Sequence, residues 1–308
     1  SVDGFVLGGR SVGPWLTAFA YGTSYFSAVV FVGYAGQFGW KYGIASTWIG
    51  IGNAVIGSLL AWVVLGRRTK IMTQHLGSKT MPDFFGQRYN SKALKIAASV
   101  IVFVFLIPYT ASVYNGLSRL FEMAFNIPYT WCVIAMALFT ALYVILGGYM
   151  ATAINDFIQG IIMLVGIVAV IAAVLNGQGG FMNAISEMAQ IPSDVAITEG
   201  QPGAFTSFFG PDPLNLLGVV ILTSLGTWGL PQMIGKFYAI KDEKSINTGT
   251  VISTLFAVVV SGGCYFLGGF ARLFDSPAIY DASTGAIVYD SIIPHMLSAL
   301  PDILIGIV

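Results

Sequence analysis

An apolar stretch from Gly13 to Gly36 is long enough to cross a membrane as one helix, but a polar segment interrupts it near its middle. The interruption reads Gly-Thr-Ser-Tyr-Phe-Ser over residues 22–27. A backbone group without a partner is costly in hydrocarbon, so membrane helices normally stay continuous. Glycine and hydroxyl residues at this depth therefore predict that the helix opens there and turns its carbonyl oxygens toward a cavity or an ion.

A second apolar stretch, Leu214 to Ile240, is interrupted in a similar way by Gly-Thr-Trp-Gly-Leu-Pro over residues 226–231. Pro231 removes a backbone donor and disrupts the helical turn before it. Two interrupted spans that lie far apart in sequence indicate the binding site of a secondary transporter. We therefore expect a transporter whose site lies between these two helices.

Composition favours a helix bundle embedded in lipid. The chain is 56% hydrophobic and 9% charged, whereas soluble domains carry about 25% charged residues. Its net charge of zero argues against nucleic acid as a partner. Cys132 and Cys264 lie in apolar runs, where small buried packing residues are expected. The sequence shows no nucleophile–base pair, phosphate loop or metal cluster, so we expect neither an enzyme nor an organic cofactor.

Seven apolar segments reach the length of about 20 residues that a membrane helix needs. They lie at roughly 12–36, 44–66, 94–123, 129–147, 154–176, 214–237 and 248–271, and an eighth begins at Pro301. A short helix is expected over residues 83–88, and an amphipathic lid helix over residues 289–300. Because the chain begins in a loop-like segment and ends within an apolar run, we expect it to be part of a longer protein.

The placement of charge predicts the orientation of these spans. Basic residues gather between the second and third spans and between the sixth and seventh, whereas the loop 177–213 has no Lys or Arg and four acidic residues. Short cytoplasmic loops are enriched in Lys and Arg, so the first span runs outward and the sixth runs inward. This predicts an inverted repeat within a single transmembrane domain, the first repeat over about 12–176 and the second from about 214 to the end at 308.

The first interruption offers oxygen ligands for a hard cation such as sodium. Opening at Thr23–Phe26 would free main-chain carbonyls, and the hydroxyls of Thr23, Ser24 and Ser27 lie within the same turn. The alternative is that these hydroxyls bond back to earlier carbonyls and only bend the helix. Asp156, at the cytoplasmic start of the fifth span, is either a relay for the cation or a helix N-terminal acid that complements the helix dipole.

Three other side chains are candidates for contact with a solute. Trp228 presents a flat apolar face and one N–H donor beside the second interruption, and Gln232 adds an amide. Tyr109 follows a proline inside the third span, where a phenol needs a partner. The alternative for the two aromatic residues is a packing role.

Five motifs in this order resemble the sodium/solute symporters, a family whose members carry proline, pantothenate, sugars and other small solutes. They are Phe-Val-Leu-Gly-Gly-Arg-Ser at 5–11, the first interruption, Thr-Met-Pro-Asp-Phe-Phe at 80–85, Gly-Gly-Tyr-Met-Ala at 147–151 with Asn-Asp-Phe-Ile-Gln at 155–159, and Trp-Gly-Leu-Pro-Gln at 228–232. The resemblance implies an all-α, polytopic transmembrane helix bundle with the LeuT-like inverted-repeat fold and two broken helices. It also implies one helix before Ser1 and further helices after Val308.

The resemblance further implies a sodium site that uses the main-chain oxygens of Thr23 and Phe26, with Ser27 beside them and the other ligands beyond Val308. Asp156 matches an acid on the inner sodium path of the family. The implied solute-binding residues are Ser24, Tyr25, Tyr109, Trp228, Gly229, Pro231 and Gln232. Proline carriers have Asp at the position of Tyr25, and sugar carriers have Asn at that of Pro231, so a sugar is disfavoured.

Together these features predict a sodium-coupled symporter that imports a small organic solute by alternating access. Pantothenate, proline or a related small carboxylate or amino acid is favoured. The expected partners are the solute, the sodium ion and the lipid bilayer, and the expected location is the plasma membrane, as a multi-pass protein of the bacterial inner membrane. The alternatives are a transporter-like sensor module of a signalling protein, a proton-coupled carrier and a channel.

Overall fold

The computed structural model describes residues 2–27, 29–301 and 304–305, and its long apolar segments are helices, as predicted. Each predicted span up to residue 271 corresponds to a helix or to a run of consecutive helices. The helices are α1 (Val2–Leu7), α2 (Pro14–Tyr25), η2 (Val29–Tyr34), α3 (Ala35–Tyr42), α4 (Thr47–Gly52), η4 (Asn53–Leu60), η5 (Trp62–Gly66), α5 (Arg67–Leu76), α6 (Met81–Arg88), α7 (Lys92–Phe125), α8 (Tyr129–Gly177), α9 (Phe181–Gln190), α10 (Pro213–Leu225), η8 (Gly226–Gly229), α11 (Pro231–Ala239), α12 (Glu243–Gly268) and α13 (Ile292–Leu297).

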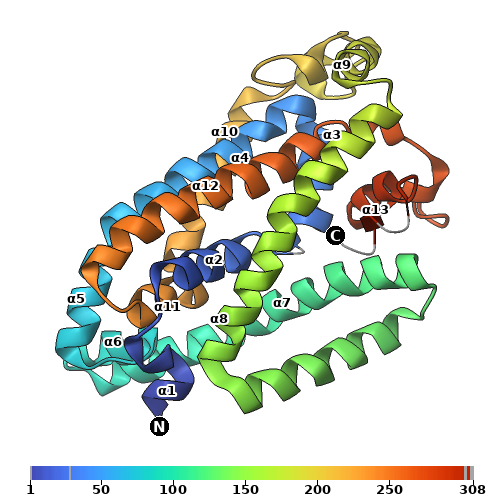
Figure 1. The fold of residues 1–308 in the computed structure, drawn as a ribbon. Coiled ribbons are helices and arrows are strands. Elements are labelled where there is room, and N and C mark those ends of the chain that lie inside the picture. The colour runs from blue at the N-terminus through green and yellow to red at the C-terminus, as the bar shows by residue number, and fades with distance from the viewer. Residues whose placement is uncertain (1, 28, 302–303, 306–308) are drawn as a thin grey trace.

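The bundle has two ends of different composition. Helices α1, α5, α6 and α11 gather at one end, and α9 and α13 lie at the other (Figure 1). The first end contains the basic loops that the sequence assigns to the cytoplasm, and the second contains the acidic loop 177–213. The basic and acidic loops therefore lie at opposite ends of the bundle, and the orientation predicted from charge stays a prediction.

Two helical runs are much longer than the about 20 residues that one span needs. Val29–Leu76 covers 48 residues and Tyr129–Gly177 covers 49. Each contains a turn at a glycine with positive φ, Gly43 (φ 62°) and Gly148 (φ 57°), a conformation that costs glycine little. Figure 1 shows α8 reversing its direction, so this helix supplies both the fourth and the fifth predicted span.

Helix α12 forms the centre of the bundle and contacts α2, α3, α4 and α8. Glycines allow these contacts to be close. A Cβ atom on Gly268 would lie 2.0 Å from the carbonyl oxygen of Ala35 in α3, and one on Gly22 would lie 2.4 Å from the ring of Phe256. Gly268 therefore permits the close approach of α12 to α3.

Helix α7 and the first half of α8 form a hairpin at one side of the bundle (Figure 1). None of the residues in the most apolar 18-residue stretch of α7 is buried. Phe103 of α7 and Phe139 of α8 are 70% and 72% exposed. A hairpin with this much exposed apolar surface fits a lipid environment and not water.

The short helices fit their predictions in part. The predicted helix at 83–88 is confirmed as α6, whose N-terminus is capped by the Thr80 hydroxyl accepting the Asp83 N–H at 3.3 Å. The helix predicted over 289–300 is shorter, since only Ile292–Leu297 is α-helical, and it is mostly buried against η2 and α3. The Nε2 atom of His295 forms a hydrogen bond with the Ser276 hydroxyl at 3.0 Å, so this side chain has a structural role here. Most of the predicted eighth span lies outside the described residues.

Candidate ion and solute site

The first predicted interruption is a break in the helix. Helix α2 ends at Tyr25, and its last backbone bond runs from the N–H of Phe26 to the carbonyl of Gly22 at 2.8 Å. Phe26 has φ −101° and ψ 61°, and the chain becomes helical again at Val29. Among the described residues, no backbone N–H is donated to the carbonyl of Thr23. Within the described part of the chain, the carbonyl oxygen of Thr23 therefore has no helical partner, although it lies inside an apolar span.

The break begins later than the sequence predicts. Thr23, Ser24 and Tyr25 are helical, so the predicted opening over Thr23–Phe26 is wrong for its first three residues. The hydroxyl of Thr23 donates to the carbonyl of Phe19 at 2.9 Å, which is the local bonding that the sequence left open as an alternative. This bond satisfies the hydroxyl within the helix, and the chain opens only at Phe26.

The second interruption is also a break. Helix α10 ends at Leu225, a 3-10 turn follows over Gly226–Gly229, and α11 starts at Pro231. Leu230 is extended (φ −73°, ψ 126°), as the residue before a proline tends to be. The two halves of the span meet at an angle of 50°.

The two broken helices are in contact. The Tyr25 hydroxyl, at the end of α2, donates to the carbonyl of Thr223 in α10 at 2.7 Å. Trp228, inside the second break, donates its indole N–H to the carbonyl of Ile56 in η4 at 3.0 Å. Two of the three predicted solute-binding aromatics, Tyr25 and Trp228, thus lie in contacts between helices, close to the breaks.

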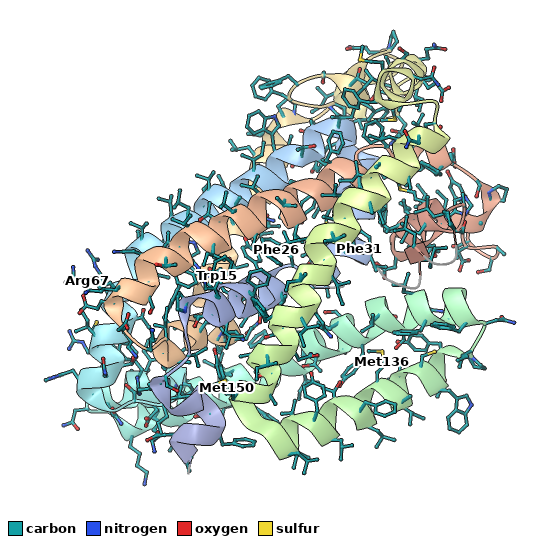
Figure 2. All side chains as sticks on the ribbon, viewed as in Figure 1. Trp15, Phe26, Phe31, Arg67, Met136 and Met150 are labelled. Atoms are coloured by element: carbon teal, nitrogen blue, oxygen red, sulfur yellow. The ribbon has the colours of Figure 1, made fainter. Side chains whose placement is uncertain are left out.

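A cavity of about 490 Å³ lies at the first break. Thr23, Ser24, Phe26 and Ser27 line one part of it, and Asp156 of α8 adds a carboxylate. The other walls come mainly from apolar side chains of α7, α8 and α12. Figure 2 shows Phe26 and Phe31, two of the lining residues, in the middle of the molecule. Oxygen atoms in one part and apolar walls elsewhere suit a cation together with a small amphipathic solute.

A buried cation lies next to Asp156. Lys236 Nζ of α11 is 3.7 Å from Asp156 Oδ2, and the two side chains are 10% and 21% exposed. The sequence grouped Lys236 with the basic residues of a cytoplasmic loop, but the structure buries it. The missed signal is spacing, because Lys236 follows the buried Met233 by three residues and therefore lies on the same face of the helix.

Comparison with known proteins agrees with this geometry. The sodium:solute symporter family matches residues 5–308. The chain belongs to that family. Proteins named sodium/proline symporter from Staphylococcus aureus and from its strain JH9 are each 35% identical to this chain over 250 residues. The match covers 79% of this chain and 45% of each relative. The chain therefore spans less than half the length of these curated relatives.

A solved structure shows the same fold. It is a Na+-coupled sialic acid symporter in a substrate-bound, outward-open state, with a TM-score of 0.74 and 16% identity over 99% of this chain and 62% of that one. The predicted all-α bundle with two broken helices is thereby confirmed, and the chain is part of a multi-pass membrane protein. The family and its named members are symporters and not enzymes.

The structure does not bring all predicted solute-binding residues to the cavity. Ser24 lines it, whereas Tyr25 and Trp228 make the contacts described above, and Gly229 and Pro231 form the second break. The remaining two are Tyr109 in α7, which is not among the lining residues, and Gln232, whose buried amide has no partner within the described part of the chain. The roles of all seven stay predictions.

Sequence reasoning also missed Asn53 of η4. Its side-chain oxygen accepts hydrogen bonds from Thr223 (3.0 Å) and Ser224 (3.1 Å) of α10, and its nitrogen donates to Ser261 of α12 at 3.3 Å. A lone amide within an apolar span is the available signal, because a polar group at membrane depth needs partners. Asn53 ties the outer half of the second broken helix to the centre of the bundle.

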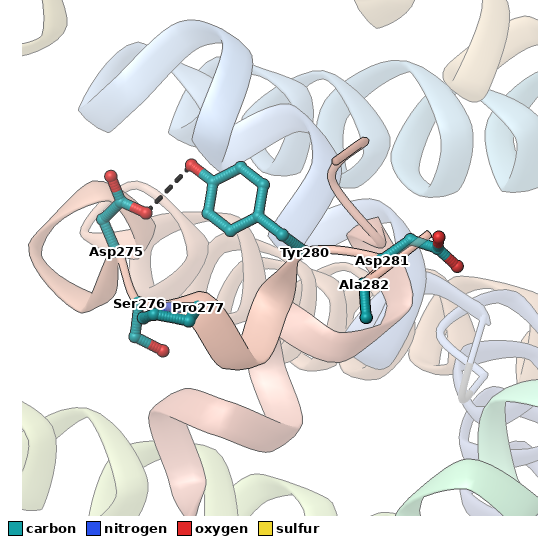
Figure 3. A pocket seen from close by; sticks show the side chains of 6 residues that line it. All are labelled: Asp275, Ser276, Pro277, Tyr280, Asp281 and Ala282. Atoms are coloured by element: carbon teal, nitrogen blue, oxygen red, sulfur yellow. Dashed lines mark hydrogen bonds between the residues drawn. The ribbon is translucent and has the colours of Figure 1, made fainter. Parts of the chain in front are cut away.

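A second hollow, of about 640 Å³, lies in the loop between α12 and α13 (Figure 3). Asp275, Tyr280 and Asp281 are among its lining residues, and the Tyr280 hydroxyl donates to Asp275 at 2.9 Å. Asp281 accepts bonds from Ser283 and Thr284, and these bonds lower the pKa of its carboxyl to about 2. The polar contacts of this hollow stabilise a loop turn, and it contains no residue predicted to bind ion or solute.

Proposed function

We propose that this chain forms the core of a sodium-coupled symporter that imports a small organic solute by alternating access. The observation that carries the proposal is the cavity at the first break, where backbone and hydroxyl oxygens and the Asp156 carboxylate meet apolar walls. Sodium entering a dry site must exchange its water for such oxygens. The contact between Tyr25 and Thr223 then lets the state of one broken helix affect the other.

In this proposal the sodium ligands from this chain are the main-chain oxygens of Thr23 and Phe26, with the Ser27 hydroxyl beside them. Support comes from the break at Phe26 and from the carbonyl of Thr23, which accepts no helical N–H among the described residues. Asp156 attracts the ion along the path to the cytoplasm, since a carboxylate on a cavity wall lowers the energy of a nearby cation.

For the solute, proline comes first and pantothenate or another small carboxylate second. Support comes from the relatives named as sodium/proline symporters, at 35% identity. Ser24 is positioned in the cavity, and the residues at the second break would complete the site when the α10–α11 pair moves toward it. Binding of sodium and solute would be reciprocal, because coupling between two sites acts equally in both directions.

The proposal includes the repeat and the location predicted from sequence. The first inverted repeat covers about 12–176 and the second starts at about 214, with one broken helix opening each. Such repeats place a shared site at mid-membrane and rock around it. The bacterial relatives favour the cell membrane of a bacterium.

The test is uptake of labelled proline and pantothenate by the full-length protein in proteoliposomes. An inward sodium gradient should drive accumulation, and an inside-negative potential should increase it, because each charge gains about 2.3 kcal/mol per 100 mV. Asp156→Asn should weaken the dependence on sodium, whereas Asp194→Asn, in the outer loop, should not. Uptake that is unchanged when choline replaces sodium would reject the proposal, and uptake driven by a proton gradient alone would favour the proton-coupled alternative.

A further inference from the structure

Lys236 is a charged group that neither the fold nor the proposed sodium path accounts for. It lies on α11, the inner half of the second broken helix, and is buried. Its ammonium contacts the carboxylate of Asp156 at 3.7 Å and faces the ring of Tyr149, whose centroid is 5.3 Å away. A buried cation is costly unless it is well paired, so a single long contact and one ring face hold it weakly.

Asp156 has a different neighbour on its other side. Its carboxylate lines the cavity at the first break together with Thr23 and Ser27, while Lys236 approaches it from α11. Asp156 therefore stands between the space open to a cation and a cation that belongs to the protein. Like charges within a few ångströms repel strongly when water is excluded, so a second cation on this carboxylate competes with the ammonium.

We propose that Lys236 is a resident cation of the Asp156 carboxylate, and that sodium entering from the cavity displaces it and thereby releases α11 from α8. Lys236 is a positioning residue in this view, since it acts on the ion through Asp156 and does not bind it. When sodium occupies the site at the first broken helix, the inner half of the second broken helix is therefore free to move. The inference rests on the proposed role of Asp156 in the sodium path.

Equilibrium binding of radiolabelled sodium to the purified full-length protein tests the proposal. Lys236→Met removes the competitor, so the sodium concentration for half-saturation should fall by about fivefold or more, the lower end of common coupling between two sites. Solute uptake should become slower at the same time, because α11 no longer exchanges one partner for another. Lys236→Arg keeps the charge and should restore both values toward those of the wild type.

Matched variants separate this effect from a loss of structure. Lys241→Met removes an exposed lysine just after α11 and should leave sodium binding unchanged. Lys236→Gln repeats the test if Lys236→Met does not purify. The double variant Lys236→Met with Asp156→Asn removes both charges and should bind sodium less tightly than Lys236→Met alone. If Lys236 had only a structural role, its removal would instead lower the stability of the protein and weaken sodium binding and uptake together.

The outcomes distinguish this inference from the proposed function. If Asp156→Asn weakens sodium binding but Lys236→Met leaves it unchanged or weaker, only the role of Lys236 is overturned. If Asp156→Asn leaves sodium binding unchanged, the role of Asp156 in the sodium path is wrong, and the inference falls with it. Tighter sodium binding with slower uptake in Lys236→Met, rescued by Lys236→Arg, supports the exchange.

Discussion

Asp83 ties α6 to the start of α7 through a short ion pair. Its carboxylate accepts a bond from Lys95 Nζ at 2.7 Å and another from the Lys79 N–H at 3.1 Å. Partial burial raises the pKa of the carboxyl, but these bonds and the nearby lysine charges outweigh it and place the pKa below its ordinary value. The contact therefore stabilises the fold fully above the unfolded pKa of about 3.9, and is lost as the pH falls through the lower, folded value.

We expect Asp83→Asn to reduce the free energy of unfolding at pH 7 by up to about 1 kcal/mol. This loss should appear as a lower melting temperature of the detergent-solubilised protein. The difference from wild type should shrink as the pH falls below about 4, because the wild-type Asp83 carboxyl is then progressively protonated and becomes neutral like the amide of the variant. Glu243→Gln is the matched control, since its pair with Arg67 at 2.6 Å is far more exposed and should contribute less. A difference that grows on acidification would contradict this account.

Tyr25 carries the direct hydrogen bond between the two broken helices, from its hydroxyl to the carbonyl of Thr223. Tyr25→Phe should cost about 1 kcal/mol of stability and should also change the sodium concentration for half-maximal uptake. Tyr21→Phe is a close control, because the Tyr21 hydroxyl on the same helix donates to the carbonyl of Gly57 at 2.8 Å. It should cost similar stability without altering the sodium dependence. Equal effects of both variants on sodium dependence would show that the Tyr25 contact carries no coupling.

At the scale of elements, the packing of α12 against α3 depends on Gly268. A Cβ atom there would lie 2.0 Å from a backbone oxygen, which cannot rotate away as a side chain can. Gly268→Ala should therefore push the helices apart and cost about 1–3 kcal/mol, measured by thermal unfolding. Gly218→Ala in α10 meets no atom within 4 Å and should be neutral or slightly stabilising. A wild-type melting temperature for Gly268→Ala would contradict the close approach.

The elements that the sequence predicts well are those with local causes. Glycine, hydroxyl residues and Pro231 mark the two breaks, and charge in the loops marks the two ends of the bundle. The residue at which α2 opens could not be predicted, because the sequence allows the Thr23 hydroxyl either to bond back to Phe19 within the helix or to belong to an opened turn. The pair of Lys236 with Asp156 joins α11 to α8, and no local pattern specifies which helices meet.

For the whole molecule, the test of the inverted arrangement is the side of the membrane on which each end of the bundle lies. Lys79 and Lys244 belong to the basic end, and Glu199 and Thr284 to the opposite end. In intact cells, a membrane-impermeant thiol reagent should label Glu199→Cys and Thr284→Cys but not Lys79→Cys or Lys244→Cys, because short basic loops stay in the cytoplasm.

The four positions together fix the directions of the two broken helices. Cys132 and Cys264 are buried and should contribute little background, which the parent protein measures. After the membrane is permeabilised, all four introduced cysteines should react. This control shows that the positions unlabelled in intact cells are protected by the membrane and are not buried within the protein. If Glu199→Cys and Lys244→Cys react from the same side, the α10–α11 pair is a re-entrant loop and not a span. The second broken helix would then not cross the membrane opposite to the first, and the proposed repeat would be wrong.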